Sequence, residues 1–169
     1  MVRLIFIVFL SASILSLCSC DMQSIKRDLP QVKIGSAPPE FYSYTLEGEE
    51  VKLHNYYGKI VMLVFWKTWC EACKQELQEM TYVQEKYRKY LTILAINMGE
   101  SKDAVRFFKR RLRLNFPVLM DQDLIISTSY GIVVWPTTIL INKEGLVHWT
   151  GVGLETGKIK KEIEILSKS

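Results

Sequence analysis

Two cysteines near the middle of the chain are the residues best suited by type and spacing to do chemistry. The stretch "FWKTWCEACKQE", residues 65–76, sets Cys70 and Cys73 two residues apart, with Trp69 directly before them and Glu76 shortly after. A pair at this spacing can contribute to a metal site, close a structural disulfide or exchange electrons with another protein. The rest of the sequence must distinguish these three uses.

Neither a metal site nor a structural staple explains this pair well. A structural zinc site needs four ligands, but the only histidines, His54 and His148, are isolated and the chain has no second cysteine pair in its folded part. A disulfide between Cys70 and Cys73 closes a short loop, so it removes little entropy from the unfolded chain. We therefore predict no metal site and favour a redox couple, with a purely structural disulfide as the alternative.

The flanking sequence predicts unequal roles for the two cysteines. "KIVMLVFW", residues 59–66, is a nearly unbroken apolar run typical of a central strand buried on both faces. A helix is expected to begin at Cys70, and unpaired amides and the helix dipole at such a start lower a thiol pKa. Cys73 follows one helical turn later and further inside. Cys70 is thus expected to attack a partner disulfide, and Cys73 to resolve the mixed disulfide.

Other segments supply the sheet and helices that must position this pair. Strands are expected within residues 38–53 as a hairpin around Gly48, at 91–97, at 137–142 and at 146–152. Helices are expected after Cys70, after Ser101, within 123–132 and at 156–168. The apolar stripe of the first helix comprises Leu77, Met80, Val83, Tyr87 and Leu91. This order predicts an α/β fold with a central mixed β-sheet flanked by helices, and with an N-terminal β-hairpin extension.

Composition and charge exclude some functions. The chain has 169 residues, 49% of them hydrophobic and 24% charged, which suits one packed domain plus a targeting segment. The net charge of +4 is too small to indicate nucleic-acid binding. The densest basic run, Lys109–Arg113, is interpreted as the solvated face of a helix, with contact to anionic lipid as the alternative.

The N-terminus has the features of an export signal. Arg3 precedes "LIFIVFLSASILSL", an apolar run of signal-peptide length that is short for a membrane-spanning helix. Leu17, Ser19 and Cys20 then resemble a bacterial lipobox, in which cleavage leaves an acylated cysteine. We predict a signal peptide at 1–19, a lipid anchor at Cys20 with a tether over 20–35, and a folded domain at 36–169. An uncleaved anchor and ordinary secretion are the alternatives.

The sequence around the cysteines is similar to a known family. "VFWKTWCEACKQE" resembles the active-site strand and helix of thioredoxin-fold proteins, and "AINMGES", "NFPVLMD" and "WPTTILINKEG" extend the resemblance to the membrane-tethered ResA/TlpA group, from about Ala37 to Leu166. The resemblance implies a thioredoxin fold and thiol–disulfide exchange outside the cytoplasmic membrane. It implies no cofactor beyond the redox-active disulfide Cys70–Cys73. ResA-like members reduce the haem-binding CxxCH cysteines of apocytochrome c.

The resemblance also implies partners and a location. A reductase of this group needs a protein substrate with a disulfide, such as apocytochrome c, and an electron donor that crosses the membrane. We expect a monomer on the outer leaflet of the cytoplasmic membrane, on the periplasmic side in a Gram-negative cell. The lipid at Cys20 would hold it there.

Several site residues are carried over from the family. Pro136 matches a proline that follows a cis bond and lies against the disulfide. A cis bond turns the backbone of Trp135 outward, where an extended substrate segment can pair with it by strand addition. Trp69, Glu71 and Thr137 are expected to support the active site and substrate groove. Trp69 is expected to cover the sulfurs from outside, with a tryptophan that merely packs in a surface cleft as the alternative.

Glu76 is expected to move the protons of the reaction. On a helix it lies one turn beyond Cys73, on the same face. Cytoplasmic thioredoxins use a buried aspartate on the preceding strand for this task, and the matching residue here, Val64, cannot do it. ResA-like members carry a glutamate at the position of Glu76. The alternative is an exposed helix glutamate, paired with Lys74 or with an arginine.

Two departures from the family affect the substrate and the potential. Ala72 replaces a proline common between the cysteines, and Trp135 is bulkier than the usual residue before the cis-proline. A disulfide oxidase or isomerase of exported-protein folding, and a non-catalytic binding lipoprotein, are the alternative functions. The PxxxTxxC motif of peroxiredoxins fits neither cysteine. If Cys70 were its cysteine, Leu63 would stand at the proline position and Lys67 at the threonine position. If Cys73 were its cysteine, these positions would hold Trp66 and Cys70.

Overall fold

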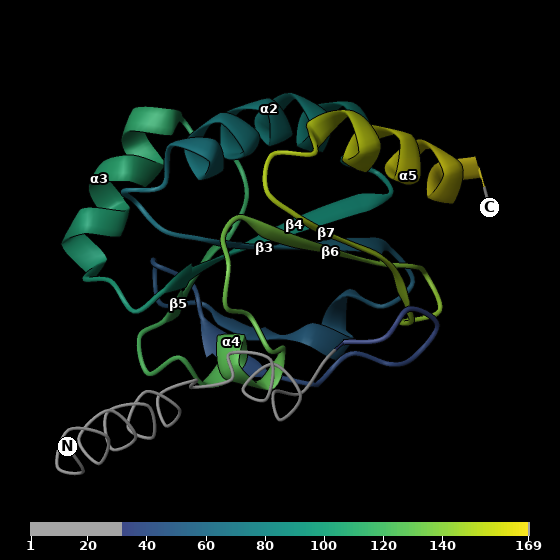
Figure 1. Cartoon of the computed structure of the whole chain (residues 1–169), viewed down its shortest axis with the longest axis horizontal. Coiled ribbons are helices and arrows are strands. Elements are labelled where there is room, and N and C mark those ends of the chain that lie inside the picture. The colour runs from purple at the N-terminus through teal and green to yellow at the C-terminus, as the bar shows by residue number, and fades with distance from the viewer. Residues whose placement is uncertain (1–31, 169) are drawn as a thin grey trace, which may run out of the picture.

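A five-stranded mixed sheet with helices on both faces forms the core of the molecule (Figure 1). The computed structural model describes residues 32–168. In chain order the elements are β1 (Tyr42–Tyr44), β2 (Glu50–Lys52), the 3-10 helix η1 (Leu53–Tyr56), β3 (Ile60–Trp66), α2 (Glu71–Tyr87), β4 (Leu91–Met98), α3 (Lys102–Leu112), β5 (Val118–Asp121), α4 (Ile125–Ser129), β6 (Thr137–Ile141), β7 (Val147–Val152) and α5 (Thr156–Lys168).

The strands lie in the order β5-β4-β3-β6-β7. β3 runs parallel to β4, and β4 parallel to β5, whereas β6 is antiparallel to both β3 and β7. Figure 1 shows α2, α3 and α5 over one face, with α4 and the small β1–β2 sheet on the other. The small sheet is joined to the edge of the large one, because the N–H of Leu46 donates to the carbonyl of Val118 at 2.7 Å.

β3 is the central strand, and all seven of its residues are buried. Its side chains alternate between two cores, as the two-residue period of a strand requires. Val64 and Trp66 lie in the core under α2, α3 and α5, whereas Leu63 and Phe65 lie in the core under α4 and η1. Because both faces are covered, the sequence of β3 is a continuous apolar run.

The predicted fold class is confirmed, with two corrections to the predicted elements. The mixed sheet, the flanking helices and the N-terminal hairpin are present. The strand β5 was not predicted, because it is only four residues long, follows Pro117 directly and has no alternation of apolar and polar residues. Leu91 does not belong to the stripe of the first helix: α2 ends at Tyr87, and Leu91 begins β4.

The predicted signal peptide at 1–19, the lipid anchor at Cys20 and most of the tether lie outside the described residues. Near the start of the described residues the chain contacts the large sheet. The N–H of Gly35 donates a hydrogen bond to the carbonyl of Val147, the first residue of β7, at 2.8 Å. Within residues 32–168, no helix has the length and apolar character needed to cross a membrane.

A buried aspartate at the end of β5 caps α4. The Asp121 carboxylate accepts hydrogen bonds from the N–H groups of Ile126 (3.0 Å) and Ser127 (2.8 Å), which have no partner inside so short a helix. α4 leads into the loop that ends at Pro136, and the Tyr130 hydroxyl donates to the carbonyl of Pro39 at 2.7 Å. Asp121 therefore helps to fix the segment that precedes β6.

Replacing Asp121 should destabilise the fold. Asp121→Ala leaves two buried N–H groups without an acceptor, so the free energy of unfolding should fall by about 1–3 kcal/mol in chemical denaturation. The matched control is Asp123→Ala, because Asp123 is exposed and its replacement should change the value by less than about 0.5 kcal/mol. Equal effects of the two substitutions would show that the cap contributes nothing.

Candidate active site

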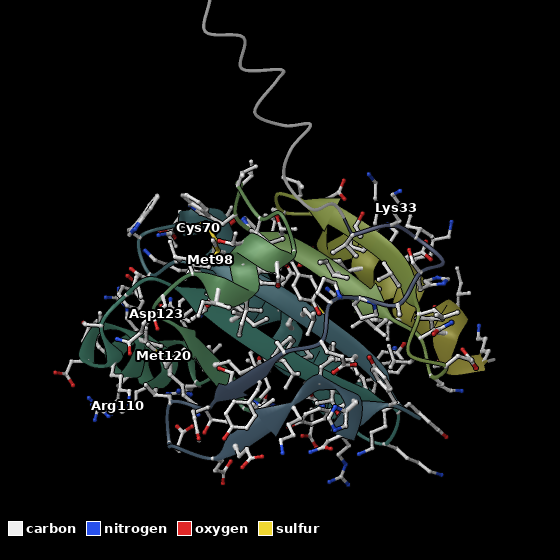
Figure 2. All side chains as sticks on the ribbon, turned by 90° about the horizontal axis from the view of Figure 1, so that it is seen from below. Lys33, Cys70, Met98, Arg110, Met120 and Asp123 are labelled. Atoms are coloured by element: carbon white, nitrogen blue, oxygen red, sulfur yellow. A yellow bond between two sulfur atoms is a disulfide. The ribbon has the colours of Figure 1, made fainter. Side chains whose placement is uncertain are left out.

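The cysteine pair lies where β3 gives way to α2. Cys70 is the N-cap of α2, and its sulfur accepts a hydrogen bond from the N–H of Cys73 at 3.1 Å. The two sulfurs form a disulfide. Cys70 is 8% exposed and Cys73 is fully buried, so a partner can reach only the first sulfur. Figure 2 shows Cys70 near the periphery of the molecule, on the same side as Met98 at the end of β4.

The segment between β3 and α2 is held by a carboxylate from the β4–α3 connection. Glu100 accepts hydrogen bonds from the N–H of Thr68 (2.7 Å), from its hydroxyl (2.6 Å) and from the side-chain amide of Asn97 (2.7 Å). The N–H of Cys70 donates to the carbonyl of Lys67 at 3.3 Å, which closes a turn. These bonds fix the backbone of the segment that leads from β3 to Cys70.

Our sequence reasoning missed Glu100 and Asn97, although a signal for them exists. Both follow the buried run of β4, and the carboxyl ends of the parallel strands β3 and β4 meet at one edge of the sheet. Polar residues directly after "LTILAIN" are therefore expected near Cys70.

Glu76 is fully buried rather than exposed. One of its carboxyl oxygens accepts a hydrogen bond from the hydroxyl of Thr138 at 2.5 Å, and the other has no hydrogen-bond partner among residues 32–168. Thr138 on β6 is the register partner of Val64 on β3. The Glu76 carboxyl thus reaches the sheet beside Val64, the position at which the sequence comparison with thioredoxins expects an aspartate.

Burial raises the pKa of Glu76 from its ordinary value of 4.5 to about 7. The hydrogen bond from Thr138 and the backbone of Glu155 oppose this shift, while the charges of Glu155 and Glu79 add to it. Loss of water around the carboxylate is the largest cause, because burial disfavours the charged form of an acid. A group with a pKa near 7 can both accept and release a proton at neutral pH.

A cis peptide bond joins Trp135 to Pro136 in the loop before β6. Pro136 is buried, and its carbonyl accepts a hydrogen bond from the N–H of Gly153 at 2.8 Å. Thr137 is the first residue of β6, and its hydroxyl donates to the carbonyl of Val134 at 2.6 Å. Within the described chain, no backbone hydrogen bond satisfies the N–H or the carbonyl of Trp135. The cis bond agrees with the one implied by the family resemblance.

The remaining predicted site residues lie at the surface. Trp69 is 62% exposed and packs edge-to-face on Trp135, with ring centroids 5.4 Å apart. Glu71 is also exposed, and its carboxylate pairs with the ammonium group of Lys74 at 3.0 Å. Ala72, between the cysteines, packs against the core under α2. The structure therefore packs Trp135 on Trp69, the residue directly before Cys70, and leaves Glu71 exposed to solvent.

We find no group of three or more His, Cys, Asp or Glu side chains within residues 32–168 that could hold a metal ion. The chemistry that the described site supports is exchange at the Cys70–Cys73 disulfide. An accessible sulfur at a helix start, a buried second sulfur and a buried acid one turn further along α2 are the parts that such exchange needs.

Comparisons with known proteins agree with this geometry. Residues 34–150 match the model of the AhpC/TSA family. The chain is 40% identical to the thiol-disulfide oxidoreductase ResA of Geobacillus thermodenitrificans over 79% of this chain and 78% of that protein. It is 35% identical to the thioredoxin-like protein YneN of Bacillus subtilis over 79% and 78% of the two chains.

A solved structure has the same overall fold. A protein from Chlorobium tepidum, described as the thiol:disulfide interchange protein DsbE, superposes with a TM-score of 0.75 at 27% identity. The alignment covers 80% of this chain and 99% of that one.

The raised pKa of Glu76 should make the stability of the protein depend on pH. Between pH 4.5 and about 7 the folded protein keeps a proton on Glu76 that the unfolded chain releases. The resulting stabilisation is complete below pH 4.5 and is lost as the pH rises through about 7, by roughly 3 kcal/mol. Glu76→Gln should remove this contribution, so the difference in unfolding free energy between Glu76→Gln and the wild type should change across this window. Parallel pH profiles for the two proteins would contradict the raised pKa.

Proposed function

The chain belongs to the AhpC/TSA family and is a thiol-disulfide oxidoreductase of the ResA and DsbE type, and on this premise we propose that it reduces disulfides in exported proteins. The favoured substrate is the CxxCH cysteine pair of an apocytochrome c before haem attachment. The arrangement of three groups carries the proposal: Cys70 is partly exposed (8%), Cys73 is enclosed, and a buried carboxyl with a pKa near 7 lies one turn beyond Cys73.

The two cysteines would act in sequence from the reduced state. The thiolate of Cys70 attacks one sulfur of the substrate disulfide, that bond breaks, and a mixed disulfide forms while the other substrate sulfur leaves as a thiolate. Cys73 then attacks the Cys70 sulfur, the substrate leaves as a dithiol, and the Cys70–Cys73 disulfide forms. Two electrons pass from the protein to the substrate, and an electron donor across the membrane must return them.

Glu76 would handle the proton of the buried cysteine. Cys73 must lose its proton before it attacks and must regain one when the disulfide is reduced, and it has no exposed surface from which water could take that proton. Glu76 is the buried carboxyl on the same helix one turn away. Its pKa near 7 lets it exchange a proton at neutral pH without a large energetic cost.

An extended substrate segment would pair with the backbone of Trp135. The free N–H and carbonyl of this residue lie next to the cis bond, and Pro136 holds the loop in place through its bond to Gly153. Strand addition of this kind gives affinity through main-chain hydrogen bonds and leaves specificity to side chains.

The proposed location is the outer leaflet of the cytoplasmic membrane. An apolar N-terminal run followed by Cys20 supports a lipid anchor, and the relatedness to ResA supports export. Because the peroxiredoxin frame fits neither cysteine, we do not propose peroxide reduction.

The direction of electron flow is tested by the reduction potential of the Cys70–Cys73 couple. The protein is equilibrated in glutathione or dithiothreitol redox buffers, and its tryptophan fluorescence reports the fraction in which the Cys70–Cys73 disulfide is formed. A reductase should have a potential near that of thioredoxin, about −270 mV, or lower. A value near that of the oxidant DsbA, about −120 mV, would instead identify a disulfide oxidase.

Trapping tests the substrate and the order of the cysteines. Cys73→Ala should accumulate a mixed disulfide between Cys70 and an oxidised CxxCH peptide, because the resolving sulfur is missing. The matched control, Cys70→Ala, should trap at least tenfold less, since Cys73 is enclosed. Equal trapping by the two variants would contradict the assigned order. Trapping of unrelated disulfide peptides as fast as the CxxCH peptide would contradict the proposed substrate.

A further inference from the structure

A lysine lies against both tryptophans at the active site. The ammonium nitrogen of Lys67 is 5.1 Å from the ring centroid of Trp135 and 5.9 Å from that of Trp69. Both distances are within the range of cation–π attraction. Because the two rings also pack edge-to-face on each other, the three side chains form one cluster, which we call the Lys67 cluster (Lys67, Trp69 and Trp135).

The charge of Lys67 is not neutralised by an acid. No carboxylate within residues 32–168 forms an ion pair with it, whereas the nearby Lys74 is paired with Glu71. Glu100, on the β4–α3 connection, accepts hydrogen bonds from Thr68 and Asn97. Aromatic rings attract a cation through their quadrupole and carry no net charge. The Lys67 cluster therefore keeps a full positive charge at a fixed place.

That place borders the position of the substrate. Lys67 belongs to the turn that ends at Cys70, because its carbonyl accepts from the N–H of Cys70. Trp69 directly precedes the accessible cysteine, and Trp135 carries the unpaired backbone groups beside the cis bond. A segment that pairs with the backbone of Trp135 and presents its sulfur to Cys70 must pass the Lys67 cluster.

We propose that Lys67 is a specificity-determining residue, an anion subsite that favours substrates with a carboxylate beside the cysteine to be attacked. The indoles hold the ammonium group in one position, so a substrate carboxylate meets a preorganised charge and the loss of side-chain freedom is small. The proposal rests on the proposed binding of substrate at Cys70 and Trp135, and it is independent of the direction of electron flow.

Three synthetic peptides test it. Each carries one Cys-X-X-Cys disulfide and differs only in the residue before the first cysteine, which is Glu, Gln or Lys. The reduced full-length protein should react with the Glu peptide about two- to fivefold faster than with the Gln peptide at low ionic strength, the size expected for an exposed ion pair. The Lys peptide should be the slowest, and roughly 0.5 M salt should compress the differences.

Variants of Lys67 separate the charge from the packing. Lys67→Met keeps the length of the side chain and should bring the Glu-to-Gln rate ratio close to one. Lys67→Arg should restore the ratio, and Lys67→Glu should reverse it in favour of the Lys peptide. A merely structural role would slow all three peptides together. Lys161→Met is the matched control, because it removes the same charge from an exposed position on α5 and should leave the ratio unchanged.

The outcomes are decisive and separate from those for the proposed function. A ratio near one in the wild type, or a wild-type ratio retained in Lys67→Met, would overturn the anion subsite. An oxidising potential would overturn the reductase function and leave the peptide ratios intact, because each ratio compares rates of the same exchange step.

Discussion

The burial of one carboxyl group, that of Glu76, is the constraint on which the rest of the site depends. Removing a carboxylate from water is costly, and the hydrogen bond from Thr138 and the backbone of Glu155 offset only part of that cost, so the acid holds its proton up to about pH 7. The arrangement requires α2 to begin directly after Cys70, so that Glu76 faces the sheet, and it requires β6 to place Thr138 beside Val64.

The same geometry explains why the two cysteines differ. The central strand and the helix meet at a short turn that Glu100 fixes. Both cysteines lie in the core under α2, but Cys70 keeps 8% of its surface exposed and Cys73 keeps none. Cys73 has no exposed surface from which water could take its proton, so the proposed exchange calls for an internal acid. In that proposal the acid is Glu76, the buried carboxyl one turn further along α2. The fold, the burial of Cys73 and the proposed proton transfer thus all depend on α2.

The sequence predicted the parts of this site that depend on local pattern. The apolar run of β3, the helical period after Cys70 and the spacing of the cysteines were sufficient for the fold and the redox pair. Contacts between distant segments were not predictable in this way: Thr138 lies 62 residues from Glu76, and only the strand register brings them together. The cis bond before Pro136 was predicted only from the family resemblance, because most X–Pro bonds are trans. Lys67 belongs to no recognised sequence motif. Its proposed role could be inferred only from the structure, which places its ammonium group against the ring of Trp135.

A direct titration of Glu76 tests the central claim most sharply. Carbon-13 labelling of the glutamate carboxyl groups, with Glu76→Gln to assign the resonance, follows the protonation of this side chain in the oxidised protein by NMR. The account predicts a midpoint near pH 7, well separated from the exposed glutamates. A midpoint near 4.5 would show that the carboxyl is solvated, and it would remove Glu76 from the proton path of Cys73.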